Sequence, residues 1–72
     1  MEYTAMTKRI RKFLENERIS YKAWDEFFEV DIYGDVYLFE RMSLRTWMWV
    51  TPVAWKRFNG SQSVIDFIDA ML

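Results

Sequence analysis

The first hydrophobic positions of the chain recur at the spacing of one helix face. They lie three or four residues apart, or adjacent, and they are Tyr3, Met6, Ile10, Phe13 and Leu14. Intervals of three and four residues are typical of an amphipathic helix. Glu17 would fall inside this apolar face, so the pattern predicts a helix over residues 3–16 that ends near Asn16, because Asn tolerates the left-handed conformation common at helix ends.

Residues 20–33 carry two overlapping patterns. Ser20 is a residue type that caps helices, and the aromatic residues that follow it recur at helical spacing. From residue 27 onward, apolar and acidic positions alternate, with Phe28, Val30 and Ile32 on one side. We expect a strand over residues 27–33, and the sequence leaves open whether residues 21–28 are helix or strand.

A Gly-Asp pair at positions 34 and 35 predicts a hairpin after this strand. Cross-strand partners share a face of the sheet, so each register groups a different set of side chains. A three-residue loop, 33–35, places Val36 and Leu38 on the aliphatic side of the first strand. A two-residue loop would group them with the acids. The sequence therefore favours the three-residue loop.

The same alternation predicts a third strand over residues 44–50, in which the aliphatic side chains and the two Trp side chains point to opposite faces. If the aliphatic sides of all three strands face the helices, large aromatic side chains and two acids gather on the other face of the sheet. The residues predicted on that face are Phe27, Glu29, Asp31, Tyr37, Phe39, Trp47 and Trp49. With a different register the rings form the core instead, and the sequence leaves open whether the face of Trp47 and Trp49 is exposed or core.

The end of the chain predicts two helices. Thr51 followed by Pro52 is typical of a helix start, and Asn59-Gly60 is typical of a helix end. Ser63 is the expected cap of a last helix with one broad apolar face. The order α-β-β-β-α-α predicts a single α+β domain over residues 1–72, in which a three-stranded antiparallel meander has helices mainly on one face.

Composition narrows the chemistry. Among the 72 residues are four Trp, four Tyr and six Phe, but no Cys and no His. Disulfides and Cys/His zinc sites are therefore excluded, and the stability of so short a chain must come from packing or from a partner. The common Ser-His and Cys-His nucleophilic sites are absent, and no Gly-rich phosphate loop is present. We expect no enzymatic activity, no metal and no cofactor.

Charge is unevenly distributed along the chain. Residues 23–40 contain six acidic residues and no basic one, whereas the segments on either side are net basic and the whole chain has a net charge of −1. One interpretation is that neighbouring blocks neutralise each other on a small surface. The other is an acidic stripe for a basic partner. No apolar run exceeds Trp47–Val50, so we expect no membrane span, no signal peptide and a cytoplasmic location.

The aromatic and acidic face predicts a protein that works by binding another protein. Exposed apolar patches mark interaction sites, and Trp and Tyr contribute much of the energy of interfaces. Acids on the same face would repel phosphate groups, which favours a protein partner, one with a basic or apolar surface. In size and layout the chain resembles accessory proteins of phages and mobile elements, such as anti-CRISPR and other anti-defence inhibitors. The resemblance implies an inhibitor of a host protein.

Two other functions stay open. The basic residues of the first helix, which fit contacts with phosphates, are Lys8, Arg9, Arg11 and Lys12. The order α-β-β-β-α also resembles the double-stranded RNA-binding domain, although Ser61-Gln62-Ser63 stands where that family has a Lys-rich helix start. The third function is a homodimeric structural subunit that buries its aromatic face against a second copy.

Overall fold

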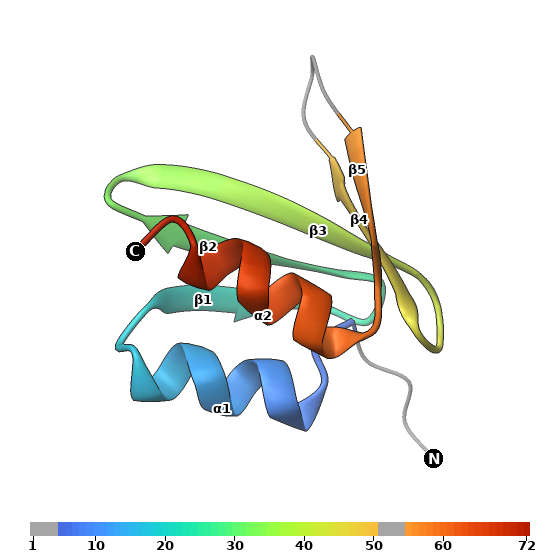
Figure 1. Cartoon of the computed structure of the whole chain (residues 1–72), viewed down its shortest axis with the longest axis horizontal. Coiled ribbons are helices and arrows are strands. Elements are labelled where there is room, and N and C mark those ends of the chain that lie inside the picture. Colours follow the sequence, from blue (N-terminus) through green and yellow to red (C-terminus); the bar gives the residue numbers. More distant parts are fainter. Residues whose placement is uncertain (1–4, 51–54) are drawn as a thin grey trace.

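The computed structural model of the chain describes residues 5–50 and 55–72. These residues form one antiparallel sheet and two helices (Figure 1). The elements in chain order are α1 (Lys8–Asn16), β1 (Ser20–Ala23), β2 (Phe27–Ile32), β3 (Asp35–Ser43), β4 (Thr46–Val50), β5 (Trp55–Asn59) and α2 (Ser61–Asp69). The strands lie in the sheet in the order β1-β2-β3-β4-β5, and each is antiparallel to the next. Both helices lie on the same face of this sheet, which confirms the α+β class (Figure 1).

The first helix is shorter than the sequence predicts. It begins at Lys8 because Thr7 caps it, and the Thr7 hydroxyl accepts a hydrogen bond from the Ile10 amide at 3.3 Å. Tyr3 lies outside the described residues. The helix ends at Asn16, as predicted, but the left-handed residue that follows is Arg18, with a φ of 57°.

Residues 21–28 are the end of β1, a turn and the start of β2. Tyr21 pairs with Val30, and Ala23 pairs with Phe28. The Trp24 amide donates a hydrogen bond to the Phe27 carbonyl at 2.8 Å, which closes the turn. The predicted strand over residues 27–33 is confirmed as β2, and the segment before it is a strand instead of a helix.

The β2–β3 hairpin has a two-residue loop, so the predicted three-residue loop is wrong. Ile32 pairs with Asp35. Tyr33 and Gly34, which form the loop, have φ values of 53° and 88°, and positive φ at both positions gives a turn whose twist matches antiparallel strands. The Asp31 carboxylate accepts a hydrogen bond from the Gly34 amide at 2.9 Å. A shift of one residue turns every side chain of β3 to the opposite face.

Most of the aromatic residues predicted on the uncovered face form the core instead. Phe39 lies opposite Phe28, the two rings stack with centroids 5.0 Å apart, and Phe39 is fully buried. Trp47 is 1% exposed, and Tyr37 and Trp49 are half-buried against the same core. The exposed position favoured for these four aromatic residues is therefore wrong, and the alternative in which they join the core is the one the chain adopts. A ring removes more apolar surface from water than Val or Leu does, so a small domain turns its rings inward.

A strand stands where the sequence predicts the second helix. Thr51 and Pro52 lie outside the described residues, but Trp55–Asn59 is β5, which pairs with β4 and places Phe58 opposite Trp47. The described sheet therefore has five strands instead of three, and the described residues form two helices instead of three.

The last helix begins two residues before the predicted cap, at Ser61, after Gly60. The Gly60 backbone, with a φ of 88°, makes the sharp entry into α2. The apolar face of α2 is as predicted, with Val64, Ile65 and Ile68 buried. Neither described helix is long and apolar enough to cross a membrane.

Candidate protein-binding surface

We call the sheet face that neither helix covers the open face; it is the far side of the sheet in Figure 1. Successive side chains of a strand point to opposite faces, so its residues are those that alternate with the core positions. From β1 to β5 these residues are Ser20, Lys22, Phe27, Glu29, Asp31, Val36, Leu38, Glu40, Thr46, Met48, Val50, Trp55, Arg57 and Asn59. Of the seven residues predicted for an aromatic and acidic face, only Phe27, Glu29 and Asp31 lie here.

An apolar row crosses the open face. Leu38 pairs with Val50, and Val50 pairs with Trp55, so these side chains are neighbours across β3, β4 and β5. Met48 lies two residues before Val50 on the same strand face. The Trp55 side chain is 72% exposed, and that of Val36, which lies two residues before Leu38 on the same face of β3, is 61% exposed. We call these five residues the apolar patch. The outer face of an antiparallel sheet is usually polar, so this apolar row is unusual.

An aromatic pair extends the patch at the turn between β1 and β2. The Trp24 and Phe27 rings stack with centroids 4.5 Å apart and planes inclined by 19°. Phe27 is half-buried, and Trp24 remains 44% exposed. Because Trp24 is outside both strands and stacks only on Phe27 among the described rings, it adds apolar surface that the core does not use.

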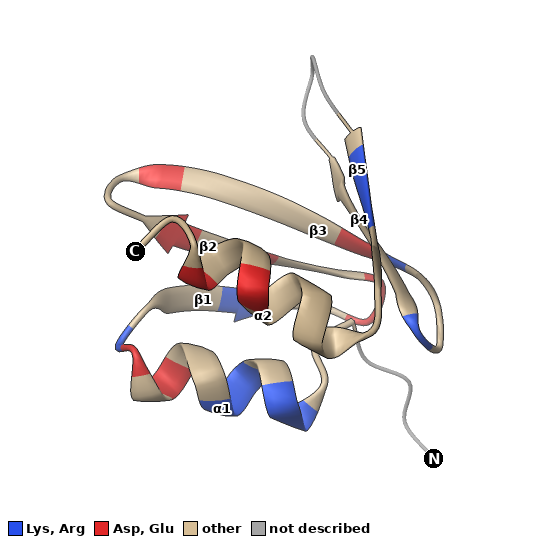
Figure 2. Ribbon diagram, viewed as in Figure 1, with Lys and Arg blue, Asp and Glu red and all other residues tan. Residues whose placement is uncertain are grey.

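Acidic side chains lie around and within this patch. Glu29, Asp31 and Glu40 are on the open face, and Figure 2 shows acidic bands on both β2 and β3. The basic residues of the open face are Lys22 and Arg57, one on each edge strand. The open face therefore combines an apolar row with a net negative charge.

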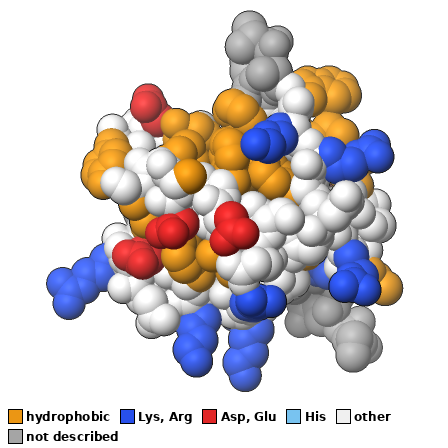
Figure 3. Space-filling view, in the orientation of Figure 1, with side chains coloured by type: hydrophobic (Ala, Val, Ile, Leu, Met, Phe, Trp, Pro, Cys, Tyr) orange, Lys and Arg blue, Asp and Glu red, His pale blue; other side chains and the backbone are white. Residues whose placement is uncertain are grey.

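The helix side of the molecule carries the opposite charge at α1. The four residues predicted to contact nucleic acid all lie on this helix and are exposed: Lys8, Arg9, Arg11 and Lys12. Figure 3 shows Lys and Arg side chains that project from this edge of the molecule, while the acids of α2 lie above them. Cations in the first turn of a helix oppose its dipole, so this arrangement destabilises α1 slightly.

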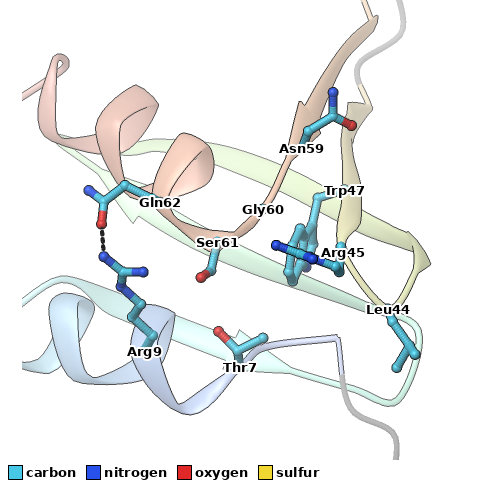
Figure 4. A pocket seen from close by; sticks show the side chains of 9 residues that line it. All are labelled: Thr7, Arg9, Leu44, Arg45, Trp47, Asn59, Gly60, Ser61 and Gln62. Carbon is cyan, nitrogen blue, oxygen red and sulfur yellow. Dashed lines mark hydrogen bonds between the residues drawn. The ribbon is translucent and has the colours of Figure 1, made fainter.

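A hollow of about 350 Å³ lies where the first turns of both helices meet the β3–β4 turn. Figure 4 shows Arg9 and Thr7 on one side, Ser61 and Gln62 on another, and Arg45 beside the Trp47 ring. The Arg9 guanidinium donates a hydrogen bond to the Gln62 side-chain carbonyl. Of the described residues that line the hollow, the charged ones are Arg9 and Arg45, and none is acidic.

Sequence reasoning missed the apolar residues of the open face because they belong to the aliphatic sides of their strands. The alternation pattern predicts Leu38, Met48 and Val50 in the core, and the local helix signals predict Trp55 in a helix. One signal was present in the sequence: the run Trp47–Val50 is apolar at every position. Such a run is typical of a strand with apolar surface on both faces.

No family model matches the chain, and no curated protein and no solved structure is significantly similar to it. The described residues contain no group of three or more acids placed to hold a metal ion.

Proposed function

We propose that this chain is a non-catalytic protein-binding module that docks a partner protein on its open face. The observation that carries the proposal is the row formed by Leu38, Val50 and Trp55, which crosses three strands on the face that neither helix covers. Removal of this surface from water supplies the driving force for association. The exposed Trp55 ring is the expected energetic centre, because Trp contributes strongly to interfaces.

The charges of the open face favour a protein with a basic rim as the partner. Glu29, Asp31 and Glu40 would repel the phosphates of a nucleic acid, but they complement Lys and Arg side chains that surround an apolar surface. A second copy of the chain fits less well. Its own open face carries the same net negative charge, so two such faces repel each other.

A protein that acts by covering a partner's surface needs no catalytic group. This mode of action fits a chain of 72 residues without Cys or His. It also fits the proposed role as an inhibitor or accessory protein of the anti-defence type, which acts in the cytoplasm on a host protein.

The test compares two pairs of substitutions of exposed apolar residues. Val36→Ser with Trp55→Ser removes apolar surface from the open face, and Tyr33→Ser with Leu44→Ser removes similar surface from the hairpin turns. Proteins captured by the wild-type chain from extracts of its source cells are identified, and the affinity of each purified partner is measured by calorimetry. We expect the open-face pair to weaken binding at least about tenfold and the turn pair to leave it unchanged. Equal affinity of the wild type and the open-face pair would contradict the proposal.

A second candidate function is nucleic-acid binding by α1. The exposed cations of the helix and the hollow lined by Arg9 and Arg45 favour it. The test measures binding of a labelled RNA duplex at low salt. Binding that is lost in the Lys8→Glu with Arg11→Glu variant but kept in the Lys22→Glu variant would support this candidate and count against the first. No binding of the duplex at low salt would eliminate it.

A further inference from the structure

An apolar groove opens on the open face between β2, β3 and the turn before β2. Within the described part of the chain, the groove is lined by Glu26, Phe27, Leu38 and Glu40, and its volume is about 260 Å³. Phe27 and Glu40 are partners across the two strands, and Leu38 lies two residues before Glu40 on the same face of β3. The groove therefore has an apolar floor and a carboxylate from each of two different segments.

The two carboxylates are free to bind a cation from outside. The Glu26 backbone carbonyl accepts a hydrogen bond from the Arg41 amide at 2.8 Å, but neither the Glu26 carboxylate nor the Glu40 carboxylate makes a hydrogen bond or an ion pair with another described residue. Both side chains are exposed, whereas the Phe27 and Leu38 side chains between them are half-buried. Glu29, which lies opposite Leu38, adds a third negative charge beside the groove.

This combination matches one type of protein side chain. A long side chain with an apolar stem and a cationic head can lie along Phe27 and Leu38 while its head reaches the carboxylates. The guanidinium of Arg is planar and carries five N–H donors, so it can bond to two carboxylates at once, whereas the Lys ammonium is a compact point charge. The face of the Trp24 ring that remains exposed next to Phe27 offers a further surface on which a guanidinium can stack.

We infer that this groove receives an arginine side chain of the partner protein. The inference rests on the proposed function, because it assigns to the docking surface its most specific contact. The apolar row supplies affinity, and the groove selects partners that carry an Arg beside an apolar surface.

The test uses a probe small enough to report on the groove alone. N-acetyl-arginine amide is titrated into the full chain, and backbone amide resonances are followed by NMR. N-acetyl-citrulline amide, which has the same shape without the charge, serves as the matched ligand. Glu26→Gln with Glu40→Gln removes both carboxylate charges, and Asp66→Asn with Asp69→Asn removes two exposed charges from α2 as the control.

We expect saturable shifts, in the millimolar range, at Phe27, Leu38 and their neighbours with the arginine probe and none with citrulline. The Glu26/Glu40 variant should lose most of the response, and the α2 variant should keep it. Equal shifts from both probes, or an unchanged response in the Glu26/Glu40 variant, would overturn the inference. If the arginine probe fails while open-face substitutions still weaken partner binding, only the groove assignment fails. If the probe binds but those substitutions have no effect, the docking proposal fails.

Discussion

The Trp47 side chain connects the sheet to the segment before α1. Its side chain is 1% exposed, and its indole Nε1–H donates a hydrogen bond to the Ala5 carbonyl at 2.7 Å. The Arg41 guanidinium lies 5.0 Å from the centre of the ring. A buried donor that loses its partner is costly, so this ring contributes both apolar area and a satisfied polar contact.

We therefore expect Trp47→Phe to lower the free energy of unfolding by about 2 kcal/mol, because the Ala5 carbonyl loses its donor and the smaller ring leaves a void. Trp55→Phe, at a position that is 72% exposed, should change it by less than about 0.5 kcal/mol. Urea denaturation followed by circular dichroism measures both values. Similar stability losses in the two variants would contradict the burial described for Trp47.

Tyr21 and Glu15 join β1 to α1. The Tyr21 hydroxyl donates a hydrogen bond to the Glu15 carboxylate at 2.8 Å. This bond, followed by desolvation and by the negative charge of Glu15, raises the pKa of Tyr21 above its ordinary value of 10.0, while Arg11 opposes the shift. Only the neutral phenol donates, so the stabilisation is fully present below the ordinary pKa and is lost as the pH rises through the raised pKa.

Glu15→Ala should bring the pKa of Tyr21 back toward 10.0, because both the acceptor and its charge are removed. Glu17→Ala, also exposed and near the end of α1, is the control and should leave it raised. The titration of the Tyr21 ring carbon by NMR gives the value. A Tyr21 titration that is the same in wild type and Glu15→Ala would show that the bond does not form.

Phe39 and Leu38 show which part of the open face can be predicted from sequence. Alternation correctly separates these two residues onto opposite faces, but it does not say which face meets the helices. That choice depends on the summed area of rings from several strands, because Phe39 packs with Phe28, Phe58 and Phe67. Contacts of this kind join residues far apart in the chain, so the prediction is correct for Phe27, Glu29 and Asp31 on β2 and wrong for the rings of β3 and β4.

At the scale of elements, the turn between β2 and β3 decides the register of the sheet. Tyr33 has the left-handed conformation, with a φ of 53°. Its side chain is 80% exposed, so contacts with the core do not stabilise this conformation. A bulky residue in this conformation is strained, whereas Asn tolerates it, and Asn-Gly is the favoured sequence for two-residue turns.

Tyr33→Asn should raise the free energy of unfolding by about 0.5–1 kcal/mol, because it relieves strain at an exposed site. Tyr33→Val, a β-branched residue in the same conformation, should lower it. The midpoints of urea denaturation curves for the two variants and the wild type give the order. If Asn is no more stable than Val at this position, the two-residue loop is not the one the chain forms.

The segment after β4 shows why another element was misassigned. Thr51-Pro52 and Asn59-Gly60 are local helix signals, but residues 55–59 pair with β4 along their whole length. Pairing buries Phe58 beside Trp47, and tertiary contacts of this kind override local propensity in a short segment. The α2 assignment was correct in type because a broad apolar face extends through the whole helix.

For the whole molecule, the main feature is a difference between its two sides. The open face is apolar and acidic, whereas the α1 edge of the helix side is basic. A net charge of −1 hides this separation. Such a charge distribution orients an approaching basic partner toward the open face, an effect that salt weakens.

The central claim is that a different protein docks on the open face, and photo-crosslinking tests it most directly. A benzoyl-phenylalanine replaces Val36 on the open face in one variant and Lys12 on α1 in another, both at exposed positions. Each variant is irradiated in an extract of the source cells. We predict a discrete adduct with a different protein from position 36 and none from position 12. An adduct from position 12 alone, a crosslinked pair of copies of this chain, or no adduct from position 36 would contradict the claim.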